Sequence, residues 1–144
     1  MAEAVVGGAD VLLVKPLSFM NLSGRPLARL LAATGGVPGD VVALVDDVAL
    51  ELGTIRVRPQ GSHGGHNGLR SIAEELGTDG FPRVRIGVRR GELPPDLAGY
   101  VLAEFPGEDA LLVQEAVGLA VEAAECLLRD GPAEAMNRFN GRRP

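Results

Sequence analysis

The sequence predicts a single α/β domain spanning residues 1–144, because apolar runs typical of buried strands alternate with segments of helical periodicity. Two runs have the length of buried strands and cover residues 11–14 and 41–45. Apolar residues recur at helical spacing in residues 25–34, 69–76 and 110–130. A chain of 144 residues is long enough to bury a sizeable core in one domain.

Composition limits the classes of partner. With a formal net charge of −5, the chain lacks the overall positive charge typical of nucleic-acid-binding proteins. Any contact with RNA therefore has to come from a local basic patch. The single cysteine, Cys126, argues against a disulfide framework and fits a reducing cytoplasm. The first residues contain no basic n-region and no long apolar run, so we expect neither a signal peptide nor a membrane span.

The first strand is expected at Asp10–Pro16, where an apolar run stops at a proline. Its continuous apolar character favours a parallel strand covered on both faces. The residues before it could supply at most the last part of a preceding hairpin strand, connected through Gly7 and Gly8. The following loop, residues 17–24, leads into a helix at 25–34 that two glycines close. Open α/β sheets bind ligands in such loops, and Asn21 and Ser23 are both possible helix caps.

Two acidic residues follow the second expected strand, Val41–Val45. A carboxylate at the end of a buried strand can orient a histidine or a water in acid–base catalysis. Asp46 directly follows the apolar run and is the stronger candidate, whereas Asp47 fits a solvated turn equally well.

The stretch Gly61–Leu69 has the densest group of chemically informative residues in the chain. It contains four glycines, both histidines of the protein (His63 and His66) and Asn67. Glycines allow positive φ and close approach to a ligand, and the junction with the helix at 69–76 favours anions such as phosphate. An ordinary glycine turn with exposed histidines would look the same. A zinc site would need a third ligand, and Cys126 lies in an apolar helical pattern, so we expect no metal.

Two further segments, Gly53–Pro59 and Phe81–Arg90, alternate apolar and polar residues and predict strands with one wet face. Their arginines are expected to form a local basic surface, comprising Arg56, Arg58, Arg83, Arg85, Arg89 and Arg90. A long helix is expected at 110–130, a break at Gly131 and Pro132, then a short helix at 133–139 and a polar basic tail.

Taken together, these motifs resemble the bacterial-type peptidyl-tRNA hydrolase family. The segments that carry the resemblance, in the family's order and spacing, are Phe19–Gly24, the strand ending in Asp46, Gly61–Leu69, Arg83–Val88, Val101–Phe105 and Ala135–Arg138. The strings FMNLSG and GSHGGHNGL are specific in combination, and either alone would be weak evidence.

The resemblance implies a single α/β domain with a mixed, mostly parallel twisted sheet flanked by helices. It implies hydrolysis of the ester between peptide and tRNA, which recycles tRNA during translation, by a cytoplasmic monomer without a cofactor. Phe19 and Met20 would shape a pocket at the tRNA 3′ end, Asn21 and Asn67 would bind substrate, Asp46 would polarise the catalytic histidine, and His66 would line the same cleft.

One part of the family pattern has no match in residues 1–10. Family members begin with a strand and an asparagine-containing turn, followed by the general-base histidine, so the first strand is expected to be missing here. His63 and His66 match other histidines of the family. Three hypotheses follow: a hydrolase whose start lies upstream, a catalytically impaired protein that binds tRNA 3′ ends, or a hydrolase in which His66 with Asp46 performs the chemistry.

Overall fold

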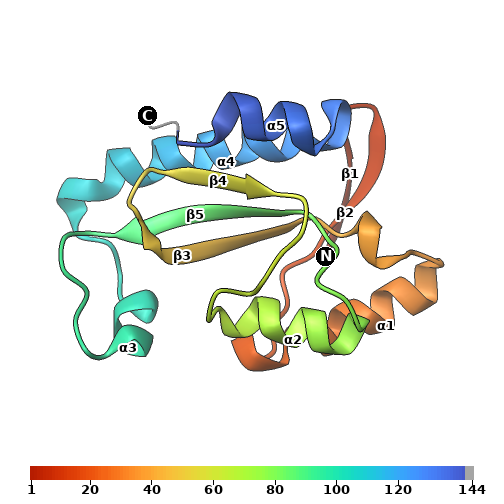
Figure 1. The fold of residues 1–144 in the computed structure, drawn as a ribbon, viewed down its shortest axis with the longest axis horizontal. Helices are drawn as coiled ribbons and strands as arrows, with labels where there is room; N and C mark the ends of the chain where they lie inside the picture. Colours follow the sequence, from red (N-terminus) through yellow and green to blue (C-terminus); the bar gives the residue numbers. More distant parts are fainter. Residues whose placement is uncertain (142–144) are drawn as a thin grey trace. The chain divides into compact units, whose positions relative to one another are not determined.

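The computed structural model describes residues 1–141 and confirms the α/β class (Figure 1). The chain forms two compact units, residues 1–43 with 58–83 and residues 44–57 with the chain from 84 onward. The end of the predicted basic tail, residues 142–144, lies outside the described residues. That residues 1–144 behave as one domain stays a prediction.

The first unit opens with an antiparallel hairpin where a parallel, buried strand was expected. β1 (Ala2–Val6) pairs with β2 (Ala9–Leu13), and the connecting Gly7 and Gly8 have φ of 58° and 83°. Leu13 is 55% exposed, so the expectation of a strand covered on both faces is wrong. Two consecutive glycines at positive φ favour a tight hairpin turn, and this local preference decides the pairing.

The helices of the first unit pack at very close range. α1 (Gly24–Thr34) follows the short 3₁₀ turn η1 (Met20–Leu22) and ends at Gly35, as expected. A second 3₁₀ turn, η2 (Pro38–Asp40), comes next along the chain. α2 (Asn67–Leu76) lies beside α1. The Gly24 N–H donates to Ser71 Oγ at 2.9 Å. A Cβ added to Gly24 would overlap the Ser71 backbone carbonyl, so only glycine fits at this crossing.

The two candidate caps of α1 have other roles. Asn21 lies within η1, and Ser23 occupies the cap position without a side-chain capping bond. Ser23 Oγ instead donates to the Met20 carbonyl at 2.8 Å, which stabilises the turn before the helix. Of the two possible cap residues, Ser23 therefore occupies the N-cap position of α1, although its side chain makes no capping bond, and Asn21 does not.

The second unit is built on a three-stranded mixed sheet, β3 (Ala43–Glu51), β4 (Ile55–Arg58) and β5 (Arg83–Arg89), in the order β3-β5-β4. β3 and β5 run in the same direction, and the central β5 is antiparallel to β4 (Figure 1). Asp46 and Asp47 lie inside β3, which continues for four residues beyond Asp47 to Glu51. The expectation that they follow the end of the strand is wrong.

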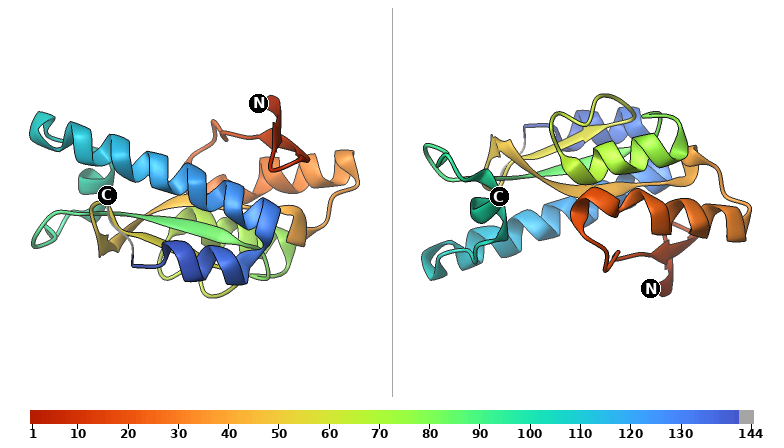
Figure 2. Two further views of the ribbon diagram at one scale, coloured as in Figure 1. Left: turned by 90° about the horizontal axis from the view of Figure 1, so that it is seen from above. Right: turned by 90° about the horizontal axis from the view of Figure 1, so that it is seen from below.

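Two helices complete the core of this unit. α4 (Ala110–Asp130) and α5 (Pro132–Phe139) match the expected positions and lie alongside the sheet (Figure 2). They are preceded in the chain by the short helix α3 (Leu97–Leu102) and the 3₁₀ turn η3 (Gly107–Asp109). The buried apolar side chains of this unit include Leu50, Ile55, Val57, Val84, Ala116, Leu119, Ala120, Ala123, Cys126, Leu127, Ala135 and Phe139. Among residues 1–141, no helix combines the length and the apolar character needed to cross a bilayer.

The outer edge of β4 is paired by a side chain. Asn140, directly after α5, accepts from the Val57 N–H through Oδ1 at 2.6 Å and donates through Nδ2 to the Val57 carbonyl at 3.2 Å. Its carboxamide thus imitates a neighbouring strand at this position, so both backbone groups of a buried residue are satisfied.

The close crossing of α1 and α2 gives a stability prediction. Gly24→Ala should lower the free energy of unfolding by about 1–3 kcal/mol, the usual cost of overpacking, because the added methyl group overlaps Ser71. Gly118→Ala is the matched control: it lies within α4 with nothing within 4 Å of the added Cβ. That substitution should stabilise by about 0.5–1 kcal/mol. Urea titrations that gave both variants the same sign of change would contradict the packing argument.

Candidate functional site

The candidate site is organised by a tight turn in the stretch Gly61–Leu69, here called the glycine loop. The His66 N–H donates to the His63 carbonyl at 3.0 Å, and the two central residues, Gly64 and Gly65, have φ of 59° and 83°. A turn with positive φ at both central positions is of type I′. Residues other than glycine, asparagine and aspartate rarely occupy these positions. The two histidines therefore occupy the first and last positions of one turn.

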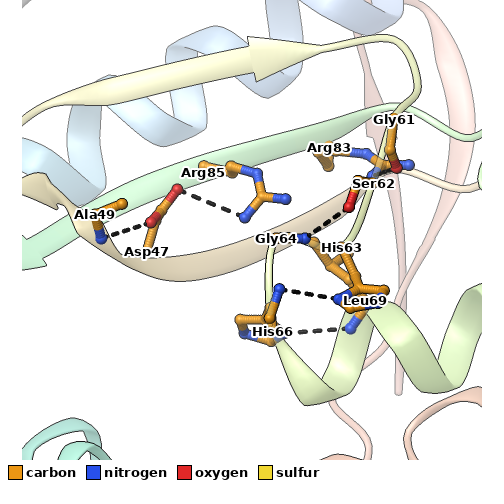
Figure 3. Close-up of polar contacts among 11 residues, drawn as sticks. Asp47, Ala49, Gly61, Ser62, His63, Gly64, His66, Leu69, Arg83 and Arg85 are labelled. Carbon is orange, nitrogen blue, oxygen red and sulfur yellow. Dashed lines mark hydrogen bonds and ion pairs between the residues drawn. The ribbon is translucent and has the colours of Figure 1, made fainter.

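Both imidazoles bend back onto the backbone of the loop (Figure 3). His63 Nδ1 accepts from the Gly65 N–H at 2.9 Å. His66 is the N-cap of α2, and its Nδ1 accepts from the Leu69 N–H at 3.2 Å. A nitrogen that accepts an N–H carries no proton, so the neutral form of each ring is protonated at Nε2. In both histidines the other ring nitrogen, Nε2, therefore carries a hydrogen and is a hydrogen-bond donor.

The turn η1 contacts the beginning of α2, and the contact depends on another glycine. A Cβ on the buried Gly68 would lie 2.6 Å from Met20 Sδ and 2.9 Å from the His66 ring. Because this Cβ is absent, both Met20 and His66 can lie close to the start of α2. The structure thus brings together two segments that are separated by more than 40 residues in the sequence.

The surface at this contact combines apolar and amide side chains. Phe19 and Met20 are 81% and 55% exposed, and Asn21 and Asn67 are also exposed. Exposed large apolar side chains beside amides offer both a stacking surface and hydrogen-bonding groups to a ligand. These predicted binding residues therefore share one region of the first unit with His66.

The two acidic candidates lie in the second unit. Asp46 is half-buried within β3. Asp47 accepts from the Ala49 N–H at 2.8 Å and forms an ion pair with Arg85 at 3.5 Å, in which each side chain is 12% exposed. Asp47 is thus a structural partner of Arg85 and not a residue of a solvated turn. The prediction that Asp46 shares a cleft with Asn21 and Asn67 stays a prediction.

The expected basic surface is smaller than the sequence pattern indicates. Arg83 is 1% exposed and donates to backbone carbonyls, so its assignment to this surface is wrong. Arg85 and Arg90 form ion pairs with acidic side chains, the latter with Glu108 and Asp109. Arg56 and Arg58 are exposed and alternate with buried residues along β4, as predicted for the wet face of that strand.

Sequence reasoning missed two residues that shape this region. Ser71 lies on the buried face of α2 between apolar residues, and a small polar residue there could have indicated a partner on another helix. Arg83 lies in the same alternating run as Arg85, and the sequence gives no signal that distinguishes the two. Within residues 1–141, no three side chains of the metal-binding types are grouped closely enough to hold a metal ion.

Comparison with known proteins gives one consistent family. The family model described as peptidyl-tRNA hydrolase matches residues 1–144. The peptidyl-tRNA hydrolase of Alkaliphilus oremlandii is 47% identical over 139 residues, which are 96% of this chain and 75% of the relative. That of Symbiobacterium thermophilum is 48% identical over 130 residues, 90% of this chain and 69% of the relative.

A solved structure extends the likeness to the fold. The crystal structure of peptidyl-tRNA hydrolase from Acinetobacter baumannii superposes with a TM-score of 0.87 at 30% sequence identity. The superposition covers 99% of this chain and 72% of that structure.

The capping role of His66 can be tested by stability alone. His66→Ala removes the acceptor for the Leu69 N–H and should lower the free energy of unfolding by about 1 kcal/mol, as typical for a lost N-cap. His66→Asn should retain most of that stability, because asparagine is among the best capping residues. Equal stability of the two variants in denaturant titrations would show that the ring nitrogen does not cap α2.

Proposed function

Because the chain belongs to the peptidyl-tRNA hydrolase family, we propose that η1 and the glycine loop hold the acceptor end of peptidyl-tRNA for attack by water. The reaction of the family cleaves the ester between peptide and tRNA and gives a peptide carboxylate and a free hydroxyl on the tRNA. The observation that supports this use of the surface is the grouping of exposed amides and apolar side chains where η1 meets α2.

The individual roles follow from the chemistry of each side chain. Phe19 and Met20 offer exposed apolar surface on which the terminal base of tRNA can stack. Asn21 and Asn67 each have a carbonyl and an NH₂ group, so they can bind the ester region of the substrate or the attacking water. Asp46 would orient the group that activates this water, from its half-buried place in β3.

His66 is suited to donate a proton in a hydrogen bond and poorly suited to accept one. Its Nδ1 already accepts from Leu69, and its Nε2 carries the proton in the neutral ring. The Nε2–H can therefore stabilise the oxygen that becomes negative during ester attack. A general base would need an unprotonated nitrogen within reach of the water, so we assign that role to neither histidine.

This assignment has a kinetic consequence. General-base catalysis contributes about 10²–10⁴-fold, so the chain should hydrolyse peptidyl-tRNA slowly while it still binds the tRNA 3′ end. We further propose that it acts as a cytoplasmic monomer without a metal. The buried, unpaired Cys126 is consistent with a reducing compartment.

Asn67 provides the sharpest test of the binding surface. Asn67→Ala should reduce kcat/KM for peptidyl-tRNA by about 10–100-fold, the effect of losing hydrogen bonds worth 1.4–2.8 kcal/mol in the transition state. Its thermal stability should hardly change, because the side chain is exposed. Asn137→Ala, an exposed asparagine on α5, is the control and should keep the full rate. Equal rates of the two variants in single-turnover assays would remove Asn67 from the site.

A second test uses the two exposed arginines of β4. If Arg56 and Arg58 contact phosphates, tRNA affinity should fall steeply with salt because bound counterions are released. Arg58→Gln should reduce the slope of log K against log salt by about one. Arg129→Gln is the control, because Arg129 pairs with Asp130 on α4. A slope that did not respond to Arg58, or responded equally to Arg129, would speak against contact through β4.

A third test separates the two roles of His66. His66→Asn keeps the cap but loses the Nε2–H, so it should fold normally and hydrolyse more slowly, by about 10-fold or more for one lost donor. If His66→Asn abolished a rate that is otherwise fast, His66 would be the general base and our assignment would be wrong. If all variants bound tRNA without hydrolysis, the chain would be a tRNA-binding protein.

A further inference from the structure

We propose that Arg83 is a positioning residue for the substrate-binding loop, because its buried guanidinium joins the start of the glycine loop to the segment that returns from α2. The role in catalysis rests on the proposed function, whereas the structural connection does not. The residues between these two anchor points include His63, His66 and Asn67, all in the first unit.

The contacts of Arg83 converge on three backbone carbonyls. Nη1 donates to the Gly61 carbonyl at 2.6 Å, and Nη2 donates to the Asp79 carbonyl at 2.6 Å. The Phe81 carbonyl accepts from Nε at 3.1 Å and from Nη2 at 2.9 Å, and the guanidinium carbon lies 4.4 Å from the centre of the Phe81 ring. Figure 3 shows the guanidinium reaching Gly61 at the start of the loop.

These contacts suit a guanidinium and no other side chain. A charged group that is 99% buried is stable only when its donors are satisfied, and carbonyl oxygens supply partial negative charge for this purpose. The planar fork of arginine directs its N–H groups along separate, fixed directions. A lysine ammonium would keep the charge but could not reach three carbonyls spread around a plane.

The connection closes the loop at its base. Gly61 and Asp79 are 18 residues apart in the sequence, and the Gly61 N–H also donates to the Asp79 carbonyl at 3.4 Å. From the fixed Gly61 the chain reaches His63 after two residues and Asn67 after six, through a turn that is closed by the hydrogen bond from the His66 N–H to the His63 carbonyl. A shift at Gly61 is therefore transmitted to the binding residues, and a displacement of about 1 Å can cost about 10²-fold in rate.

Arg83→Lys and Arg83→Met test this proposal against a matched control, Arg25→Lys. Arg25 also contacts α2, through an ion pair with Glu75 at 3.6 Å, but both side chains are largely exposed and the pair should contribute little. Amide hydrogen exchange by NMR would follow the Gly65 and Leu69 N–H groups, which donate to the two histidines. Single-turnover kinetics with peptidyl-tRNA would give the rate of hydrolysis and the affinity separately.

We expect both Arg83 variants to accelerate exchange at Gly65 and Leu69 by at least about 10-fold relative to amides of α4. The rate of hydrolysis should fall by about 10–100-fold with little change in tRNA affinity. Arg25→Lys should change neither quantity. Full rescue by lysine, or equal acceleration of exchange throughout the chain, would overturn the proposal.

A measurement on the unsubstituted protein keeps the test decisive if the variants do not fold. The Arg83 guanidinium should show separate, slowly exchanging Nη–H resonances, in contrast to the exposed Arg25. Averaged Nη–H signals from Arg83 would overturn the proposal. If the unsubstituted chain shows no hydrolysis, the proposed function fails on that result, and the exchange data alone decide whether Arg83 fixes the loop.

Discussion

The candidate site depends on a backbone constraint, the positive φ of Gly64 and Gly65. This turn reverses the chain within four residues, so the imidazole of His63 reaches the Gly65 N–H and His66 arrives at the start of α2. The histidine orientations are thus consequences of the turn. A Cβ at either glycine would strain the backbone and disturb the cap of the helix as well.

Glycines elsewhere in the first unit act by a different mechanism. Gly24 and Gly68 have no unusual backbone conformation, but each lies where another element comes too close for a side chain. Gly24 lets α1 approach α2, and Gly68 lets Met20 approach the helix that His66 caps. The surface formed by η1 and α2 therefore exists because two positions have no Cβ, and this packing places the exposed amides near each other.

Local periodicity predicted the helices well and the strands less well. The residues of α4 follow one clear helical stripe, and glycines mark the ends of α1 and α2, so their bounds could be derived from the sequence. An apolar run such as residues 11–14 does not reveal its partner, and here the Gly7–Gly8 turn made it an exposed hairpin strand. The two consecutive aspartates, Asp46 and Asp47, suggested the end of a strand. The ion pair between Asp47 and Arg85 instead allows β3 to continue. Alternation likewise placed Arg83 and Arg85 on one wet face, although the backbone carbonyls of Gly61, Asp79 and Phe81 draw Arg83 into the interior.

The two nitrogens of His66 illustrate how a structural role can limit a chemical one. Nδ1 stabilises α2 only while it is unprotonated, because a protonated nitrogen cannot accept the Leu69 N–H. If the ring took a proton at Nδ1 during catalysis, that step would break the helix cap next to Asn67. A donor role at Nε2 avoids this conflict, since donating a hydrogen bond does not require the ring to take up a proton. The geometry thus favours the proposed role of His66 as a donor that stabilises developing charge over a role as the general base.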